Sequence, residues 1–488
     1  MPYKRITELR KNGNLDGAYS LAIQCLLDEP TNIWVRHAMS WVLLDKMKSA
    51  SNIVPLLEQV ADLDLDCRQE SMFYDALTWR IAQYVKSLDL RSPQVDVIFN
   101  IIKDFSFKPS QGYSFLFKAF HAHRGSWLRY IEFCEWWGFY NFLPEDYCKY
   151  KISSGQEVMS LVEQAYIGYA KVLIGATNAE ERIYAFLPQL EKIYSEHNEY
   201  QYPPYFLAKL YLKIDNRSAA MEVLLPFLRR KSTDYWVWQT VGDVATDDNV
   251  KFSCYSKALL CRAKPEMLVA IKEAYAIMLA DRKLYNEAKT EIEQIIAIRN
   301  NNGWRLTENI NNLICLEWYD LATQLKSNVK CYETHQQAAI DLFASDLTRL
   351  SVLVVAINKQ KKIVNYVTSD RQNGAFNYMR VMKTPPTVGD KLDVFFAQFG
   401  TDGFGKATLV RPCATPDVWA GKVIEFAGTL CVDHARGFGI VRFLGKQIFV
   451  PRQLVEGSVN GDFVEGEAVA SFDKKQQKNG WTAFKIHK

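Results

Sequence analysis

The sequence predicts a multidomain α + β protein, with an N-terminal α-solenoid followed by two small five-stranded β-barrels. Three observations lead to this prediction. Helical periodicity with recurrent Gly, Ala and Pro positions extends through residues 1–345. Near residue 345 the hydrophobic period changes to two, and Gly, Val and Thr replace Ala and Leu. Two sets of strand patterns follow, which predict domains at 346–411 and 428–488 with a linker at 412–427.

Composition limits the class of protein. The 488 residues are too many for one core, since single domains usually have about 100–200 residues. No apolar run approaches the ~20 residues that a membrane-spanning helix needs, and the polar N-terminal segment contains no signal-peptide pattern. The cysteines form no CxxC pair, which is typical of a reducing compartment. We therefore expect a cytoplasmic protein with no membrane partner, no metal site and no cofactor.

Positive charge is concentrated in the C-terminal third. Residues 346–488 carry 20 Lys and Arg against 13 Asp and Glu, a net charge of +7. Residues 1–345 carry 39 Lys and Arg against 42 Asp and Glu, a net charge of −3. This asymmetry permits a polyanionic partner for the predicted barrels.

Repeated motifs characterise the helical part. In residues 13–32 a Gly opens a turn, Ala18 and Cys25 share one helix face, and Pro30 follows the helix end. Residues at further positions of the same repeat pattern are Trp34, His37, Ala38, Trp41, Trp238, Val241, Gly242, Ala258, Pro265 and Ala288. They resemble tetratricopeptide (TPR) repeats, although residues 60–200 lose the consensus. The resemblance implies stacked helical hairpins whose concave face holds a protein partner, and a mere spacer is the alternative.

Residues 105–150 are rich in aromatic side chains, with sixteen Phe, Trp and Tyr residues. Trp127, Tyr130, Phe133 and Trp137 follow the spacing of one helix face, which favours a buried core, while a surface for a partner is the alternative. His121 and His123 lie nearby without acidic or Cys neighbours in sequence, so we expect satisfied or surface histidines and not metal ligands.

Five strands are predicted in the first β unit. They are Val352–Ile357, Ile363–Val367, Phe376–Val381, Leu392–Phe399 and Ala407–Val410. Five short strands within this length are typical of the OB-fold, a small barrel that binds oligonucleotides.

The second β unit contains two motifs of a known family. RGFGIV (Arg436–Val441) and IFVP (Ile448–Pro451) resemble the two ribonucleoprotein motifs of cold-shock domains, KGFGFI and VFVH. The unit looks most like the cold-shock domains of bacterial exoribonucleases. Because the sequence continues only to Lys488, we expect nucleic-acid binding without their catalytic domain. Ile440 and Pro451 depart from the family pattern.

The resemblance implies specific binding residues. Phe438 and Phe449 would form a surface on which unstacked bases lie, with Gly437 and Gly439 leaving room for a base. The candidate phosphate contacts are Arg436, Arg442, Arg452, Lys474, Lys475 and Lys478. By a looser analogy, the first barrel offers Tyr366, Phe376 and Tyr378 as base-stacking candidates.

Catalytic motifs are absent from the sequence. The segment Gly400–Lys406 has the glycine and lysine spacing of a P-loop, but Ala407 stands where a hydroxyl should bind magnesium, and two strands flank the segment. We therefore expect a protein that is not an enzyme. It would bind RNA or single-stranded DNA through its barrels and a protein through its solenoid. The alternative is a protein-only scaffold, for example of a bacterial regulatory or anti-phage system, and a hydrolase within residues 60–200 is a third hypothesis.

Overall fold

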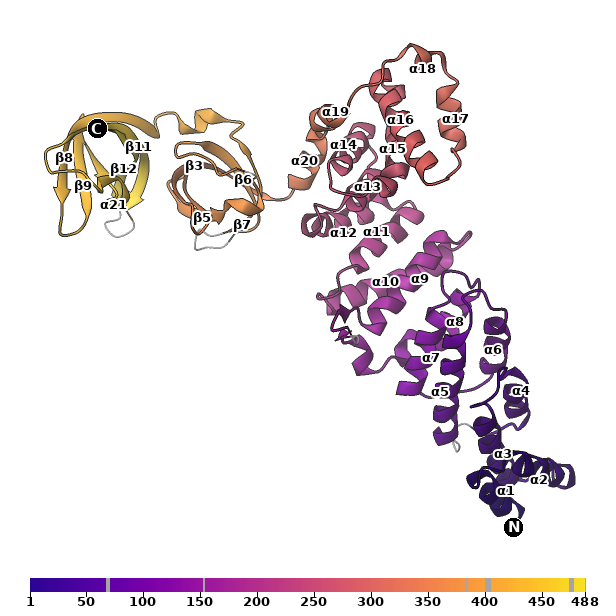
Figure 1. The fold of residues 1–488 in the computed structure, drawn as a ribbon. Helices are drawn as coiled ribbons and strands as arrows, with labels where there is room; N and C mark the ends of the chain where they lie inside the picture. Colours follow the sequence, from indigo (N-terminus) through magenta and orange to yellow (C-terminus); the bar gives the residue numbers. More distant parts are fainter. Residues whose placement is uncertain (67–70, 152–153, 383, 400–404, 474–477, 488) are drawn as a thin grey trace. The chain divides into compact units, whose positions relative to one another are not determined.

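A computed structural model describes residues 1–488 except 67–70, 152–153, 383, 400–404, 474–477 and 488 (Figure 1). The chain forms two compact units, Met1–Lys251 and Phe252–Lys488. The first unit is helical, and the second contains helices followed by strands. None of the described helices is long and apolar enough to cross a membrane.

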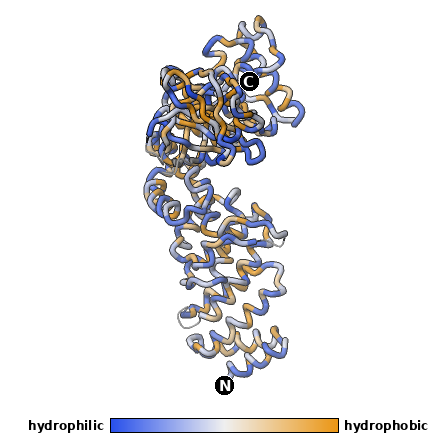
Figure 2. Tube along the Cα trace, turned by 90° about the vertical axis from the view of Figure 1, so that its left-hand side faces the viewer, coloured by the Kyte–Doolittle hydropathy of each residue, from blue (hydrophilic) through white to orange (hydrophobic). Residues whose placement is uncertain are grey.

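Consecutive helices pack against one another in the first unit. The helices are α1 (Pro2–Lys11), α2 (Leu15–Asp28), α3 (Ile33–Lys46), α4 (Val54–Asp62), α5 (Ser71–Ser87), α6 (Gln94–Ile102), α7 (Gln111–His121), α8 (Tyr130–Trp137), α9 (Leu161–Gly175), α10 (Glu180–Glu196), α11 (Pro203–Lys213), α12 (Arg217–Arg230) and α13 (Tyr235–Val244). A short hairpin of β1 (Tyr150–Lys151) and β2 (Glu157–Val158) precedes α9. Figure 2 shows hydrophobic and hydrophilic residues alternating along these helices, as amphipathic packing requires.

Polar caps and small residues explain the local structure. Asn14, Asn32 and Asn216 each accept a hydrogen bond from a backbone N–H in the first turn of α2, α3 and α12. Ala18 and Ala22 of α2 are fully buried, and α2 contacts both α1 and α3. Ala18, which was singled out in the sequence, therefore lies where helices approach closely.

The aromatic-rich segment forms part of the first core. Tyr130, Phe133 and Trp137 are fully buried and Trp127 is 7% exposed, which confirms the prediction of a core face. His121 is buried and its Nδ1 lies 2.6 Å from the Tyr130 hydroxyl. His123 bonds the backbone oxygen of Val85 through Nε2 at 3.1 Å. His121 is hydrogen-bonded, as expected, whereas Nδ1 of the buried His123 has no hydrogen-bond partner among the described residues.

Helices occupy the first part of the second unit. They are α14 (Asp248–Leu259, which begins just before the unit), α15 (Val269–Asp281), α16 (Tyr285–Asn301), α17 (Glu308–Ile314), α18 (Glu317–Leu321), α19 (Val329–His335) and α20 (Gln337–Ala344). The change from helix to strand falls near residue 345, as predicted. The boundary between compact units lies earlier, because the backbone N–H of Ala339 donates to Ser253 Oγ and ties α20 to α14.

The first β domain is a five-stranded sheet. Its strands are β3 (Thr348–Asn358), β4 (Ile363–Thr368), β5 (Asn373–Asn377), β6 (Lys391–Phe399) and β7 (Gly405–Pro412). The antiparallel order is β5-β4-β3-β6-β7. The predicted strand Phe376–Val381 is wrong, because Asn377 accepts a hydrogen bond from Met379 N and the chain turns there. Most of the P-loop-like segment Gly400–Lys406 lies outside the described residues.

A buried carboxylate ties the first sheet to the segment that follows it. Asp393 is 1% exposed and accepts hydrogen bonds from Arg349, Ser351 and the backbone N–H of Ala414 at 2.7–3.0 Å. Burial raises the pKa of Asp393, but these hydrogen bonds outweigh burial and hold the pKa below its ordinary value.

The second β domain is a closed five-stranded barrel. Its elements are β8 (Val423–Asp433), β9 (Phe438–Phe443), β10 (Lys446–Val450), α21 (Arg452–Val455), β11 (Phe463–Asp473) and β12 (Lys478–His487). The strand order is β10-β12-β11-β8-β9, with β10 and β12 parallel and the other pairs antiparallel. β8 begins inside the segment 412–427 that was predicted as a linker, because Phe426 packs into the barrel core.

A further hydrophobic cluster connects residues of the two sheets. Leu353 and Val367 of the first sheet pack with Trp419, Val469 and Phe484, and each of these side chains is at most 3% exposed. Apolar burial at this cluster stabilises the contact between the two β domains of the second unit.

Candidate nucleic-acid interface

The barrel carries two phenylalanine rings on its outer face. Strand alternation directs Val441 and Ile448 into the core, where both are fully buried, and directs Phe438 and Phe449 outward. Phe449 is 42% exposed and Phe438 is half-buried. We call these two residues the ring pair.

The register of the β9–β10 ladder brings the ring pair together. Phe449 is directly opposite Ile440, so Phe438 is its diagonal neighbour on the same face. The ring centroids lie 5.3 Å apart with an angle of 36° between the ring planes. The two rings are therefore neighbours on adjacent strands, as predicted, with Phe449 exposed and Phe438 only partly exposed.

The loop before β9 is ordered by an aspartate and a glycine. Asp433 Oδ1 accepts the backbone N–H groups of Ala435 and Arg436, each at 3.1 Å. Gly437 has φ +70°, a backbone conformation that residues other than glycine rarely adopt. A Cβ at Gly437 would lie 3.3 Å from Cδ of Arg452, so the Arg452 side chain lies beside Gly437.

Three arginines lie on β9 or on the segments that precede and follow the β9–β10 hairpin. Arg436, Arg442 and Arg452 are exposed, and Arg436 makes only a long 3.9 Å ion pair with Asp433. Lys478 is also exposed, at the start of β12. Lys474 and Lys475 lie outside the described residues. The three arginines therefore provide positive charge on the β9 side of the barrel.

Gly439 does not leave room for a base, which is the role that the sequence predicted for it. Gly439 faces the core, and a Cβ there would lie 2.6 Å from Leu430 Cδ1 and 3.1 Å from Val455 Cγ2. The space at Gly439 is thus filled by core side chains and does not admit a base.

The aromatic candidates of the first β domain are core residues. Tyr366, Phe376 and Tyr378 are 1%, 3% and 5% exposed and pack in the sheet core. Burial raises the pKa of Tyr366 to about 12. Neighbouring side chains cover their faces, so the assignment of these three rings as base-stacking residues is not supported.

Sequence reasoning missed two features of the barrel. Lys446 Nζ lies 4.6 Å from the centre of the Trp481 ring, at the end of β10. Away from the ring pair, Glu425, Glu465 and Glu467 line a hollow of about 420 Å³ on β8 and β11. Glu425 lies directly opposite Glu467 in the ladder, and this acidic pairing could be recognised only after the register was known.

The described residues contain no cluster of three or more His, Cys, Asp or Glu side chains suited to a metal ion. On the barrel, the ring pair and the nearby arginines offer chemistry for a ligand. They provide flat apolar faces and positive charge, which is the combination that single-stranded nucleic acids require.

Comparisons with known proteins agree with this geometry. Residues 345–408 match S1/CSD-like domain 1 of the TOTE conflict systems, and residues 424–486 match S1/CSD-like domain 2 of the same systems. Residues 201–339 match a domain of unknown function, DUF7017. No curated protein matches the chain.

One similar solved structure is "drosophila Unr CSD456", which is 16% identical with a TM-score of 0.12. The match covers 29% of this chain and 61% of that structure, so the chain spans less than two thirds of its length. The family matches and the observed barrel agree: the C-terminal region carries S1/CSD-like domains, and it follows a helical N-terminal region.

Proposed function

We propose that the chain is an adaptor without catalytic activity, which binds RNA or single-stranded DNA through its C-terminal barrels and a protein through its helical part. The observation that carries the nucleic-acid function is the ring pair, two partly exposed rings 5.3 Å apart on adjacent strands. An exposed ring keeps a face available for a base, and stacking contributes roughly 1–3 kcal/mol per base.

The charges around the barrel favour one direction of approach. Arg436 precedes Gly437 in the chain, and the Arg452 side chain lies beside Gly437, one residue before Phe438. The carboxylates of Glu425, Glu465 and Glu467 repel phosphates from the β8–β11 face. A single strand would therefore cross β9 and β10, with its bases on the ring pair and its phosphates near the arginines.

The finer architecture is also part of this proposal. The helical part would consist of TPR-like hairpins, which is supported by the buried Ala18, Ala258 and Ala288 on α2, α14 and α16. The first sheet would be a second OB-type barrel, since its order β5-β4-β3-β6-β7 repeats the order of the closed barrel without the ladder between its end strands.

A protein-only scaffold is the second candidate. Ile440, directly opposite Phe449 in the ladder, stands where the cold-shock pattern has a second Phe, and the aromatic candidates of the first sheet are buried. Such a scaffold would act within a conflict system, as the names of the two matching domains suggest.

Titration of labelled single-stranded RNA and DNA with the full chain separates the two candidates. Fluorescence anisotropy at two salt concentrations should show binding that weakens as salt increases. If neither nucleic acid binds at low salt, the adaptor function is wrong and the scaffold is retained.

A further inference from the structure

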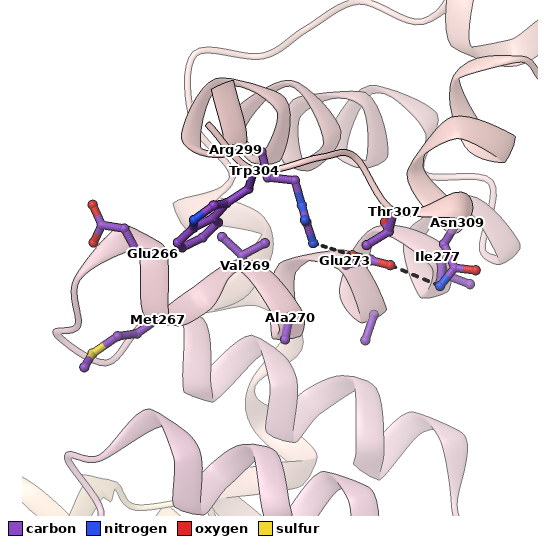
Figure 3. Close-up of a pocket in the computed structure, with 11 residues that line it drawn as sticks. Glu266, Met267, Val269, Ala270, Glu273, Ile277, Arg299, Trp304, Thr307 and Asn309 are labelled. Atoms are coloured by element: carbon purple, nitrogen blue, oxygen red, sulfur yellow. Dashed lines mark hydrogen bonds and ion pairs between the residues drawn. The ribbon is translucent and has the colours of Figure 1, made fainter. Parts of the chain in front are cut away.

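A pocket of about 550 Å³ lies among the helices of the second unit (Figure 3). Its floor is one face of α15, formed by Val269, Ala270, Glu273, Ala274 and Ile277. Ala270 and Ala274 are one helical turn apart, and their small side chains leave the floor hollow. The volume falls within the range of about 300–1,000 Å³ that is typical of ligand pockets.

Two large apolar side chains at the pocket are in contact with solvent. Met267 is 57% exposed and Trp304 is 45% exposed. The end of α16 holds Trp304 in place, because Gly303 has φ +67° and the backbone N–H of Trp304 donates to Arg299 O at 2.8 Å. Figure 3 shows the Trp304 indole beside Val269 and Met267 at the outer edge. Covering both side chains would remove apolar surface from water.

The charges of the pocket are not balanced. Glu273 is neutralised, because Arg299 Nη2 lies 3.5 Å from it and Asn309 Nδ2 donates to it at 3.0 Å. Arg299 Nη1 also donates to the backbone oxygen of Arg305 at 2.7 Å. Glu266 makes no ion pair with any residue that the structure describes. The uncompensated charge of the lining is therefore negative.

We propose that this pocket binds an extended peptide segment of a partner protein, in which an apolar side chain is adjacent to a Lys or Arg. The inference rests on the adaptor function proposed above and specifies the chemistry of its protein partner. The apolar side chain would pack on Ala270 and Ala274 between Met267 and Trp304, and the cation would pair with Glu266. The Trp304 indole N–H, which donates to no described residue, is available to a peptide carbonyl.

Nucleic acid fits this pocket poorly. Glu266 would repel phosphates, and Arg299, the cation in the lining, is already engaged by Glu273 and the backbone oxygen of Arg305. The pocket and the ring pair therefore have opposite charge preferences, as two sites for different partners require.

The test is a selection from a random peptide library displayed on phage. The full chain serves as bait, and the full-length Ala270→Trp variant, whose larger side chain fills the hollow, removes peptides that bind elsewhere. Enriched sequences should place an apolar residue next to Lys or Arg. A synthetic peptide with the commonest sequence should bind Trp304→Ala and Glu266→Lys about tenfold or more weakly than the unmodified chain.

Leu321→Ala is the matched control, since Leu321 is 85% exposed on α18 and does not line the pocket. It should leave peptide affinity unchanged. The inference is wrong if no sequence class is enriched, if the selected peptides are acidic, or if Trp304→Ala binds the peptide as the unmodified chain does. Circular dichroism confirms that each variant is folded.

Binding of single-stranded RNA is measured on the same variants. Loss of peptide binding with intact RNA binding supports the pocket. Loss of RNA binding in Trp304→Ala would assign the pocket to the nucleic-acid site and overturn this inference. A chain that selects peptides but binds no RNA would refute the proposed nucleic-acid function and leave the pocket as a peptide site.

Discussion

Phe449 lies diagonally across the β9–β10 ladder from Phe438, and their ring centroids are 5.3 Å apart on the outer face of a closed barrel. Aromatic side chains of this size usually contribute to a core. Here the core below them is complete without them, since Val441, Ile448 and Val450 are fully buried. The ring pair is therefore available for a function other than packing.

We predict that replacing both rings separates binding from stability. Phe438→Ala combined with Phe449→Ala should weaken binding of single-stranded RNA by roughly 2–6 kcal/mol, the sum of two stacking contributions before any non-additivity. The melting temperature should change little, because both rings are partly exposed. Phe463→Ala is the control, because Phe463 is 62% exposed on β11. Unchanged RNA affinity in the double variant, or its failure to fold, would contradict the stacking surface.

The arginines should determine how salt affects binding. Each phosphate contact contributes about −0.7 to the slope of log affinity against log salt for a single strand. Arg436→Gln and Arg452→Gln should each make the slope less negative by about this amount and weaken all sequences alike. Lys485→Gln, which alters a residue paired with Glu467, should leave the slope unchanged. If the salt slopes of Arg436→Gln and Arg452→Gln equal that of the control Lys485→Gln, the two arginines do not contact phosphates.

We predict that a side chain at Gly466 destabilises the barrel, because β11 and β12 approach each other closely there. A Cβ at Gly466 would clash with the Lys485 backbone oxygen and lie 3.1 Å from Ile486 Cα, and backbone atoms cannot move aside cheaply. Gly466→Ala should therefore destabilise the barrel by about 1–3 kcal/mol or more. Gly480→Ala is the matched control, since its nearest neighbour would be Ser471 Oγ at 3.9 Å. Urea unfolding of both variants measures the difference, and equal midpoints would contradict the close approach.

The stability of the first unit should depend on the protonation of His121. Burial, with smaller contributions from Arg124 and Lys171, lowers its pKa from 6.5 to about 3. Between these values the unfolded chain binds a proton that the folded chain does not, so stability is present above about pH 6.5 and decreases as pH falls toward 3.

Urea unfolding of His121→Gln at several pH values tests this dependence. The variant should lose stability at pH 7, because it loses the bond to Tyr130 and the ring contact with Phe117. Its stability should then vary less between pH 7 and pH 5 than that of the unmodified chain. A parallel pH dependence in both proteins would show that His121 is not the titrating group.

We predict that residues 340–488 fold without the preceding helices. The fragment keeps both β domains, the cluster around Trp419 and the 2.7 Å ion pair between Arg411 and Asp341. It loses α14, all of α19 and the first turn of α20, including Ala339, whose backbone N–H donates to Ser253 Oγ of α14 in the full chain. Circular dichroism should show a cooperative transition for the fragment. If the 340–488 fragment is unfolded while a 252–488 fragment is folded, the domain boundary lies at Phe252 instead.

The sequence alone indicated the helical part, the change to strands near residue 345 and the outward position of Phe438 and Phe449. These features follow from local periodicity, because alternation and helical spacing determine which side chains share a face. The same reasoning correctly favoured a core for the aromatic residues around Trp127 and Trp137.

Only the tertiary structure decided what covers each residue. Tyr366 and Phe376 follow the same alternation as surface rings, yet strands distant in sequence bury them. The sequence predicted that Gly439 leaves room for a base, but in the fold the Leu430 side chain packs against Gly439. The pocket between Ala270 and Trp304 likewise depends on how α15, α16 and α17 pack. Periodicity is a local property of the chain, whereas exposure depends on contacts between segments far apart in sequence, and a single sequence does not specify those contacts directly.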